Sequence, residues 1–281
     1  MRVHHLNCAT MRPYGGRLID GRGGLFHRAT MVCHCLLIET DDGLVLVDTG
    51  LGVGDVTDPD ATLTPRFRFI AQPVLDIEET AVRQVARLGY DPVDVRHIVL
   101  THLDVDHAGG LPDFPHATVH VHQAEHRAAM ARATPAERSR YRPQHWAHGP
   151  DWRTYGAADG ERWFGFEAVR ELDGLPPQIL LIPLAGHTRG HSGVAVDLGD
   201  RWLLHAGDAI FFHRETDPVR PYCPPGLDGF QRMMETEREP RLANQERLRA
   251  LARAHGEKVH IFPAHDLTAL RRAEDRAASR A

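Results

Sequence analysis

The segment THLDVDHAGG at residues 101–110 contains two histidines and two aspartates within six positions. These four candidate ligands are His102, Asp104, Asp106 and His107. The first three alternate with apolar residues, so an extended loop would point them in one direction. Converging imidazole nitrogens and carboxylate oxygens are what a hydrolytic metal ion such as zinc requires. The alternative is a polar loop with two ordinary histidines, which the dense spacing between an apolar run and two glycines makes less attractive.

Three further residues of the same types lie beyond this segment, each after an apolar run and beside small residues. They are His187 in AGHTRGHSG, Asp208 in HAGD and His265 in PAHD. Sites in α/β folds form where strands end at the edge of a sheet. We therefore expect these three side chains to meet the 101–110 segment at one sheet edge.

An alternation of strands and helices is expected to position these residues. Periodicity and turn residues predict strands at 31–39, 44–48, 96–101, 117–122, 178–184, 194–198, 202–205 and 258–262, with another at 3–10. Helices are predicted at 78–89, 123–133 and 242–255 and in a charged, external tail from 267. Residues 55–75 and 213–229 are rich in proline and are predicted to be irregular. This order indicates an α/β layered fold.

The length of 281 residues and the absence of a low-complexity linker favour a single domain over 1–281. Residues 134–176 are predicted to be an irregular insertion within it. We expect this insertion and residues 211–230 to form the substrate pocket. Its aromatic residues would either line that pocket or pack the insertion onto the core. They are Trp146, Trp152, Tyr155, Trp163 and Phe164.

The overall composition excludes several classes of function. A net charge of −5 and a pI near 6.5 give no reason to expect a nucleic-acid partner. No apolar run approaches the roughly 20 residues that span a bilayer, and residues 1–16 lack a secretory signal. Four cysteines are too few for disulfide bonds to stabilise a fold of this size, which is consistent with a reducing compartment. We therefore expect a cytoplasmic enzyme with a small-molecule substrate, and the oligomeric state stays open.

The cysteines give no sign of thiol chemistry. Cys33 and Cys35 alternate within the apolar run MVCHCLLIE, which favours packing inside the protein over metal binding. Cys8 and Cys223 lie in no motif, so no reaction is assigned to them.

From about residue 31 to 266 the chain resembles the metallo-β-lactamase-fold hydrolases. The family hallmark is a His-x-His-x-Asp-His loop, then a Gly-His-Thr-x-Gly-His stretch, an Asp at a strand end and a late His. The corresponding parts here are HLDVDH at 102–107, GHTRGH at 186–191, Asp208 and His265. The loop VDTG at 47–50 also matches, and residues 34–50 look most like the branch that opens acyl-homoserine lactones. The resemblance implies a four-layer αββα sandwich with metals at one edge.

The resemblance also implies a role for each ligand. Two divalent ions, with zinc expected, would share Asp208 as a bridge. The first would be held by His102, Asp104 and His187, and the second by Asp106, His107 and His265. A metal-bound hydroxide would attack a lactone or other carboxylic ester, with Asp106 or Asp208 orienting it and shuttling its proton. Asp48 would bind the metal ligands without contacting the metal itself. His191 would either donate a hydrogen bond to the oxyanion or form one with the backbone.

Two positions depart from the family pattern. Asp104 replaces the second histidine of the hallmark, and this harder oxygen donor favours iron or manganese at the first site more than histidine would. It could also fall short of the metal and leave that site weak or empty. Phe211 stands where the homoserine-lactone hydrolases have a tyrosine, and a phenyl ring cannot donate a hydrogen bond.

Several other functions remain possible on the same scaffold. They are a phosphodiesterase or β-lactamase, a mononuclear non-haem iron oxidoreductase acting on a thiol or persulfide, and a metal-binding protein without turnover. Asp104 favours the iron enzyme slightly through its oxygen ligation.

Overall fold

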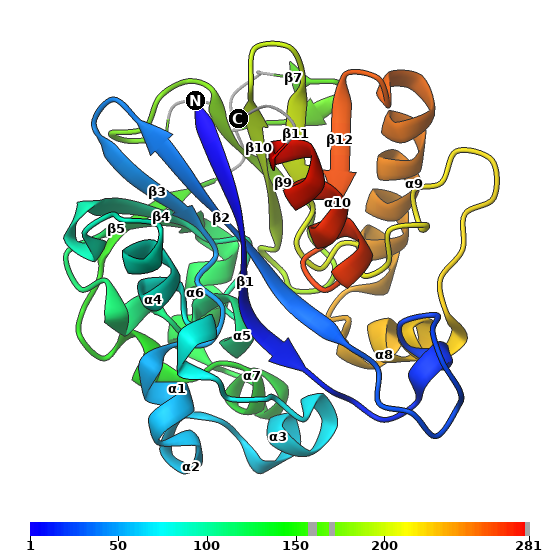
Figure 1. Ribbon diagram of the computed structural model, residues 1–281, viewed down its shortest axis with the longest axis horizontal. Coiled ribbons are helices and arrows are strands. Elements are labelled where there is room, and N and C mark those ends of the chain that lie inside the picture. The colour runs from blue at the N-terminus through cyan, green and yellow to red at the C-terminus, as the bar shows by residue number, and fades with distance from the viewer. Residues whose placement is uncertain (157–161, 169–171, 279–281) are drawn as a thin grey trace.

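The computed structural model describes residues 1–156, 162–168 and 172–278, and this part of the chain contains two main β-sheets (Figure 1). The first sheet has the strand order β1-β2-β3-β4-β5-β6, in which β3 to β6 run parallel. Its strands are β1 Arg2–Met11, β2 Met31–Thr40, β3 Gly43–Val47, β4 Val95–Val99, β5 Thr118–His122 and β6 Asp151–Tyr155. Residues 31–38 of β2 are all buried, because this strand packs on both of its faces.

The second sheet has the order β12-β11-β10-β9. Its strands are β9 Ile179–Pro183, β10 Ser192–Asp197, β11 Trp202–His205 and β12 Val259–Phe262. Since β10 is antiparallel to β9 and β11, and β11 is parallel to β12, three of the strands end at the same edge. A small separate hairpin joins β7 Arg162–Trp163 to β8 Phe166–Glu167.

The two sheets pack face to face, and helices cover both outer faces (Figure 1). The core between the sheets includes Leu36 and Val47 from the first sheet and Leu181 and Val194 from the second. Helices α4 Ala81–Arg87 and α6 Gln123–Ala131 contribute to the core outside the first sheet. Helix α9 Arg238–His255 packs outside the second sheet. The α/β layered fold predicted from the sequence, a four-layer αββα sandwich, is therefore confirmed.

The expected strands are all present, with ends within two residues of those predicted. The prediction of irregular structure at 55–75 is wrong, because this range contains α2 Pro59–Thr62 and α3 Pro65–Ala71, after α1 Val53–Thr57. Pro59 and Pro65 lie in the first turns of these helices, where a missing N–H costs no hydrogen bond. The same reason explains why α8 Pro225–Met234 begins inside the range 213–229.

Residues 134–176 hold more regular structure than predicted. They include α7 Pro135–Arg140, the edge strand β6 and the small hairpin, although residues 157–161 and 169–171 lie outside the described part. The C-terminal helix α10 Leu267–Ala278 packs on β1 and β2 and buries Ala269 and Leu270, so it is less external than expected. Among the described residues, no helix is both long and apolar enough to span a membrane.

Candidate metal centre

The structure brings all seven predicted ligand residues together. The segment 102–107 follows β4 of the first sheet, whereas His187, Asp208 and His265 follow β9, β11 and β12 of the second. The site therefore lies at an edge shared by two sheets, not at the edge of one sheet as expected. Packing of the sheets against each other brings these two sets of ligands together.

The predicted extended loop at 102–107 is wrong in its second half. Residues Val105–Ala108 form the short helix α5, and Asp104 occupies its N-cap position. The alternation with apolar residues misled the prediction, because Val105 packs in the core from a helical turn. Gly109 and Gly110 then pass so close to the backbone at 49–50 that a side chain would not fit.

Asp208 lies at the centre of the cluster, and its two carboxylate oxygens face different ligands. Oδ2 is 3.3 Å from Nε2 of His187 and 3.8 Å from Nε2 of His102. Oδ1 is 3.1 Å from Nε2 of His265 and 3.4 Å from Nε2 of His107. A carboxylate placed in this way can bridge two cations.

The first ligand group consists of His102, Asp104 and His187, whose ligand atoms lie within 4.8 Å of one another. Asp104 Oδ2 is 3.0 Å from His187 Nε2 and 3.4 Å from His102 Nε2. Among the described residues, the buried Nε2 of His102 has no hydrogen-bond partner. A buried nitrogen without a hydrogen-bond partner is costly, so this atom is suited to bind a cation.

The second ligand group contains His107 and His265, with Asp106 beside them. Nε2 of His265 is 3.3 Å from Nε2 of His107 and 3.5 Å from Oδ2 of Asp106. The other ring nitrogens are fixed from behind, because Nδ1 of His107 lies 2.8 Å from Asp48 and Nδ1 of His265 lies 2.7 Å from the carbonyl of Val32. These contacts leave each Nε2 directed into the site, as metal-binding histidines require.

The carboxylate of Asp48 also holds Thr101, the residue just before the ligand segment 102–107. Its two carboxylate oxygens accept hydrogen bonds from the backbone N–H and the hydroxyl of Thr101, both at 2.8 Å. Burial would lower the pKa of His107, but Asp208 and Asp48 raise it well above its ordinary value. Binding of a cation at His107 would therefore release a proton.

Charges within the cluster favour ionised carboxylates. Burial alone would raise the pKa of Asp208, but His265, His107 and His187 hold it well below its ordinary value. Burial lowers the pKa of His187, and the Arg140 guanidinium adds to this effect, which gives a value of about 4. An ionised carboxylate and a neutral imidazole are the forms that bind a metal. The donor set of imidazole nitrogens and carboxylate oxygens thus fits divalent cations such as zinc, iron or manganese.

Arg140, at the end of α7, is a residue of this site that the sequence reasoning missed. Its Nε lies 2.9 Å from Oδ1 of Asp104, and both side chains are nearly buried. No spacing signal marks it among 33 lysines and arginines, and the helix that carries it lies in a range predicted to be irregular.

His191 and Cys33 lie beside the ligand cluster. His191 donates from Nδ1 to the carbonyl of Leu184 and accepts from the backbone N–H of Asp208, so it bonds to backbone. Cys33 is buried as predicted, yet its sulfur lies within 4.8 Å of ligand atoms of Asp106 and His265. Its place beside the second group was not predicted.

A cavity of about 610 Å³ opens at the ligand cluster. Asp104, Asp106, His187, Asp208 and His265 form its floor, and Phe211 forms part of the wall. The remaining wall is largely apolar, with side chains from the N-terminal loop, α3 and α8. These are Pro13, Ile19, Phe67, Ile70, Leu227, Phe230 and Met233. Of the predicted segment 134–176, the described residues that line the cavity all lie within 134–141, and the segment 211–230 contributes Phe211, Leu227 and Phe230. The N-terminal loop and α3, which were not predicted to line it, supply another side.

The five aromatic residues of the insertion do not line this cavity. Trp163 and Trp146 are buried in the two outer cores, and Trp152 packs against one of them, which supports packing as their role. Phe211 instead lies against the ligands, with its ring stacked on His265 at a centroid distance of 5.3 Å.

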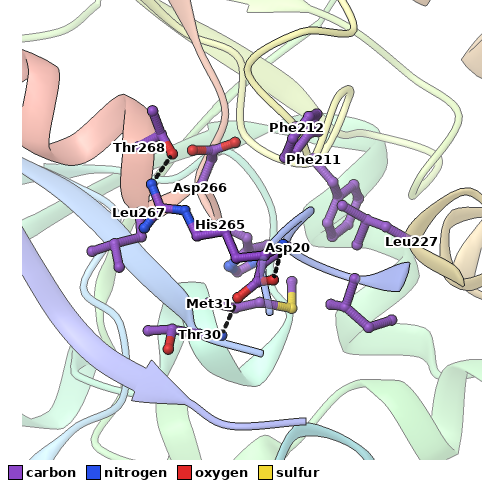
Figure 2. A pocket seen from close by; sticks show the side chains of 12 residues that line it. Asp20, Thr30, Met31, Phe211, Phe212, Leu227, His265, Asp266, Leu267 and Thr268 are labelled. Carbon is purple, nitrogen blue, oxygen red and sulfur yellow. Dashed lines mark hydrogen bonds between the residues drawn. The ribbon is translucent and has the colours of Figure 1, made fainter. Parts of the chain in front are cut away.

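Hydrogen bonds hold the N-terminal loop next to His265. Figure 2 shows Asp20 and Met31 beside His265, with Phe211 and Leu227 on the other side of this small pocket. The backbone N–H of Thr30 donates to Asp20 at 2.9 Å, and Arg22 donates to the Thr268 hydroxyl of α10 at 2.7 Å. These bonds hold the loop against the last ligand.

Comparisons with known proteins agree with this arrangement. Residues 29–265 match the family model described as the metallo-beta-lactamase superfamily. A Mycobacterium tuberculosis protein, named as a probable metallo-hydrolase, is 45% identical over 266 residues, which cover 95% of this chain and 80% of the relative. An N-acyl homoserine lactonase of Bacillus thuringiensis is 34% identical over 98 residues, or 35% of this chain and 39% of that protein.

A solved structure of an N-acyl homoserine lactone hydrolase, with the product N-hexanoyl-L-homoserine at its catalytic metal centre, is similar over almost the whole chain. Its TM-score is 0.69 at 20% identity, and the match covers 95% of this chain and 94% of that one. At this level of identity the likeness shows a shared fold.

Proposed function

Since the chain belongs to the metallo-beta-lactamase superfamily and is a metallo-hydrolase by that membership, we propose that it hydrolyses a lactone or another carboxylic ester. The proposal includes two divalent cations per chain, with zinc as the expected ion and iron or manganese as the alternative at the Asp104 group.

The position of Asp208 carries this proposal. One carboxylate oxygen faces His102 and His187, and the other faces His107 and His265. His102, Asp104 and His187 would hold one cation and Asp106, His107 and His265 the other, with Asp208 shared, and bound cations would supply Lewis acidity toward a carbonyl and lower the pKa of water.

The protein's own carboxylates supply the proton chemistry. Asp106 and Asp208 both line the cavity floor, so their oxygens are placed to accept a proton from the attacking water and to return it to the leaving oxygen. Arg140 is held by protein groups, because its guanidinium donates to the His187 and Met234 carbonyls and the Thr236 hydroxyl and pairs with Asp104.

The cavity supports a substrate with an apolar part. Its volume and its wall from α3, α8 and the N-terminal loop suit a small ester or lactone with a hydrocarbon chain. Phe211 gives an apolar surface where a tyrosine hydroxyl would polarise a homoserine lactone, so other lactones and aryl esters are expected to be the better substrates.

The test is a substrate panel run with the purified protein of measured metal content. Lactones, aryl esters, β-lactams and phosphodiesters are assayed side by side, together with oxygen uptake in the presence of persulfide. Two ions per chain with lactone or ester turnover is the expected result. A single iron with oxygen consumption would overturn the proposal, as would turnover confined to β-lactams or phosphodiesters.

A further inference from the structure

Arg140 and Asp104 form a nearly buried ion pair at the rim of the first ligand group, with side-chain exposures of 12% and 10%. The two carboxylate oxygens of Asp104 have different surroundings. Oδ1 contacts Nε of Arg140 at 2.9 Å, whereas Oδ2 points to the nitrogens of His187 and His102. One oxygen is therefore held by the protein, and the other lies among the ligand atoms.

The guanidinium itself is fixed by three other segments. Its Nη1 donates to the His187 carbonyl at 3.0 Å and to the Thr236 hydroxyl at 2.9 Å, and Nη2 donates to the Met234 carbonyl at 2.7 Å. A longer contact of 3.3 Å joins Nη2 to Nε2 of His187. Three of the four Nη N–H groups are bonded to protein oxygens, so the side chain cannot swing away without breaking several bonds.

We propose that Arg140 is a positioning residue that makes Asp104 a single-oxygen metal ligand. The guanidinium holds Oδ1, so only Oδ2 is directed at the cation that His102 and His187 also face. Its positive charge also cancels the negative charge that aspartate adds, so the pair has the same net charge as a neutral histidine. Asp104 and Arg140 together thus take the place of the single histidine that the family has in the hallmark loop. This inference rests on the proposed two-cation site.

The geometry argues against the other explanation of this contact, in which the guanidinium takes the place of the first cation. A guanidinium in that place would contact the oxygen of Asp104 that faces the histidines, but it contacts the opposite one. It also makes no hydrogen bond to Nε2 of His102, which stays without a partner among the described residues. Cation binding would break only the long contact to His187.

A double-mutant cycle on metal binding tests the pair without using hydrolysis as the readout. Cobalt(II) is titrated into metal-free wild type, Arg140→Gln, Asp104→His and the double variant, with visible absorption and elemental analysis as measurements. Arg138→Gln is the matched control, because Arg138 lies on the same helix but is exposed and donates only to the carbonyls of Arg132 and Ala133. Circular dichroism checks that each variant is folded.

Wild type is expected to bind two ions. Asp104→His should weaken the first-site ion by about tenfold, because the guanidinium then faces a dication with no carboxylate between them. The double variant should return to within about threefold of wild type, and the Arg138→Gln control should match wild type. If Arg140→Gln does not fold, Asp104→His alone still tests the proposal. Unchanged or tighter binding of the first-site ion by Asp104→His would contradict it.

Two other results would also overturn it. Additive effects in the cycle would show that the two residues act independently. A single ion in wild type, with a second appearing in Arg140→Gln, would show that the guanidinium replaces the cation. Absence of ester or lactone turnover together with an intact cycle would contradict the proposed function and leave the pairing of Arg140 with Asp104 standing.

Discussion

Asp208 connects the two ligand groups through its separate oxygens, and it lies nearly buried at the floor of the cavity. The carboxylate also sits where a proton must be held during hydrolysis. Its removal should therefore affect metal content and turnover together, more than removal of any ligand that belongs to one group.

Asp208→Asn is predicted to lower the bound metal from two ions to at most one, and to lower kcat/KM for the best ester or lactone by at least about 100-fold. The amide keeps the size of the side chain but loses the charge that attracts both cations. Elemental analysis and steady-state kinetics check this. The control is Asp228→Asn, whose carboxylate pairs with Arg232 on the exposed face of α8. Full metal content in Asp208→Asn would contradict the bridging role.

At the scale of elements, the short helix α7 carries Arg140 into the site. The helix begins with a capping box, in which the Thr134 hydroxyl accepts from the N–H of Glu137 at 3.1 Å and the Glu137 carboxylate accepts from the N–H of Thr134 at 2.9 Å. A helix of six residues has little stability of its own, so it depends on this cap and on its tertiary contacts.

Thr134→Ala is predicted to lower the free energy of opening of α7 by about 1 kcal/mol, because one N–H at the helix start loses its acceptor. Amide hydrogen exchange of residues 136–141 measures this opening directly. Thr134→Ser keeps the hydroxyl and should exchange at the wild-type rate. Equal protection in Thr134→Ala would show that tertiary contacts alone hold the helix.

At the scale of the whole molecule, the ligands come from both sheets, so bound cations would join the two halves of the sandwich. Chelation is predicted to lower the melting temperature, because a ligand that binds only the folded state stabilises it by about 2.7 kcal/mol at 100 times its dissociation constant. Calorimetry with and without a chelator checks this, and added metal should restore the original value. Asp208→Asn should respond less to chelation. An unchanged melting temperature in wild type would mean that folding does not depend on the cations.

A second property of the whole molecule is its response to acid. His120 is buried in the first sheet between the side chains of His97 and Tyr155, at 2.9 and 2.8 Å. Burial lowers the pKa of His120 to about 3, with help from His97. Since the unfolded chain binds this proton near pH 6.5 and the folded chain does not, acid favours unfolding.

The free energy of unfolding should therefore fall between pH 6.5 and 3, by up to about 1.4 kcal/mol per pH unit from His120. His120→Gln should be less stable at pH 7, through lost contacts, but should show a shallower fall toward pH 5. Urea unfolding at pH 7, 6 and 5 measures both effects, and the exposed His116→Gln serves as the control. Parallel curves for His120→Gln and wild type would rule His120 out as a source of acid sensitivity.

The sequence predicted the strands and all seven candidate ligands, because each of the four segments that carry these residues follows an apolar strand. It could not predict Arg140, since the partner of Asp104 comes from another helix and is fixed only by the tertiary fold. Helices α2 and α3 were missed because Pro59 and Pro65 look like helix breakers, although they occupy first-turn positions. The part of the apolar cavity wall that α3 provides was missed with them.

His107 and His265 have ring nitrogens 3.3 Å apart although 158 positions separate them in the chain. A ribosome therefore has to synthesise the chain as far as residue 265 before the second ligand group can form. A nascent chain that ends before β12 holds the 102–107 segment without its distant partner. A cation at the second ligand group would therefore bind only after β12 has been made, and its binding would depend on the ion reaching a chain that has already folded.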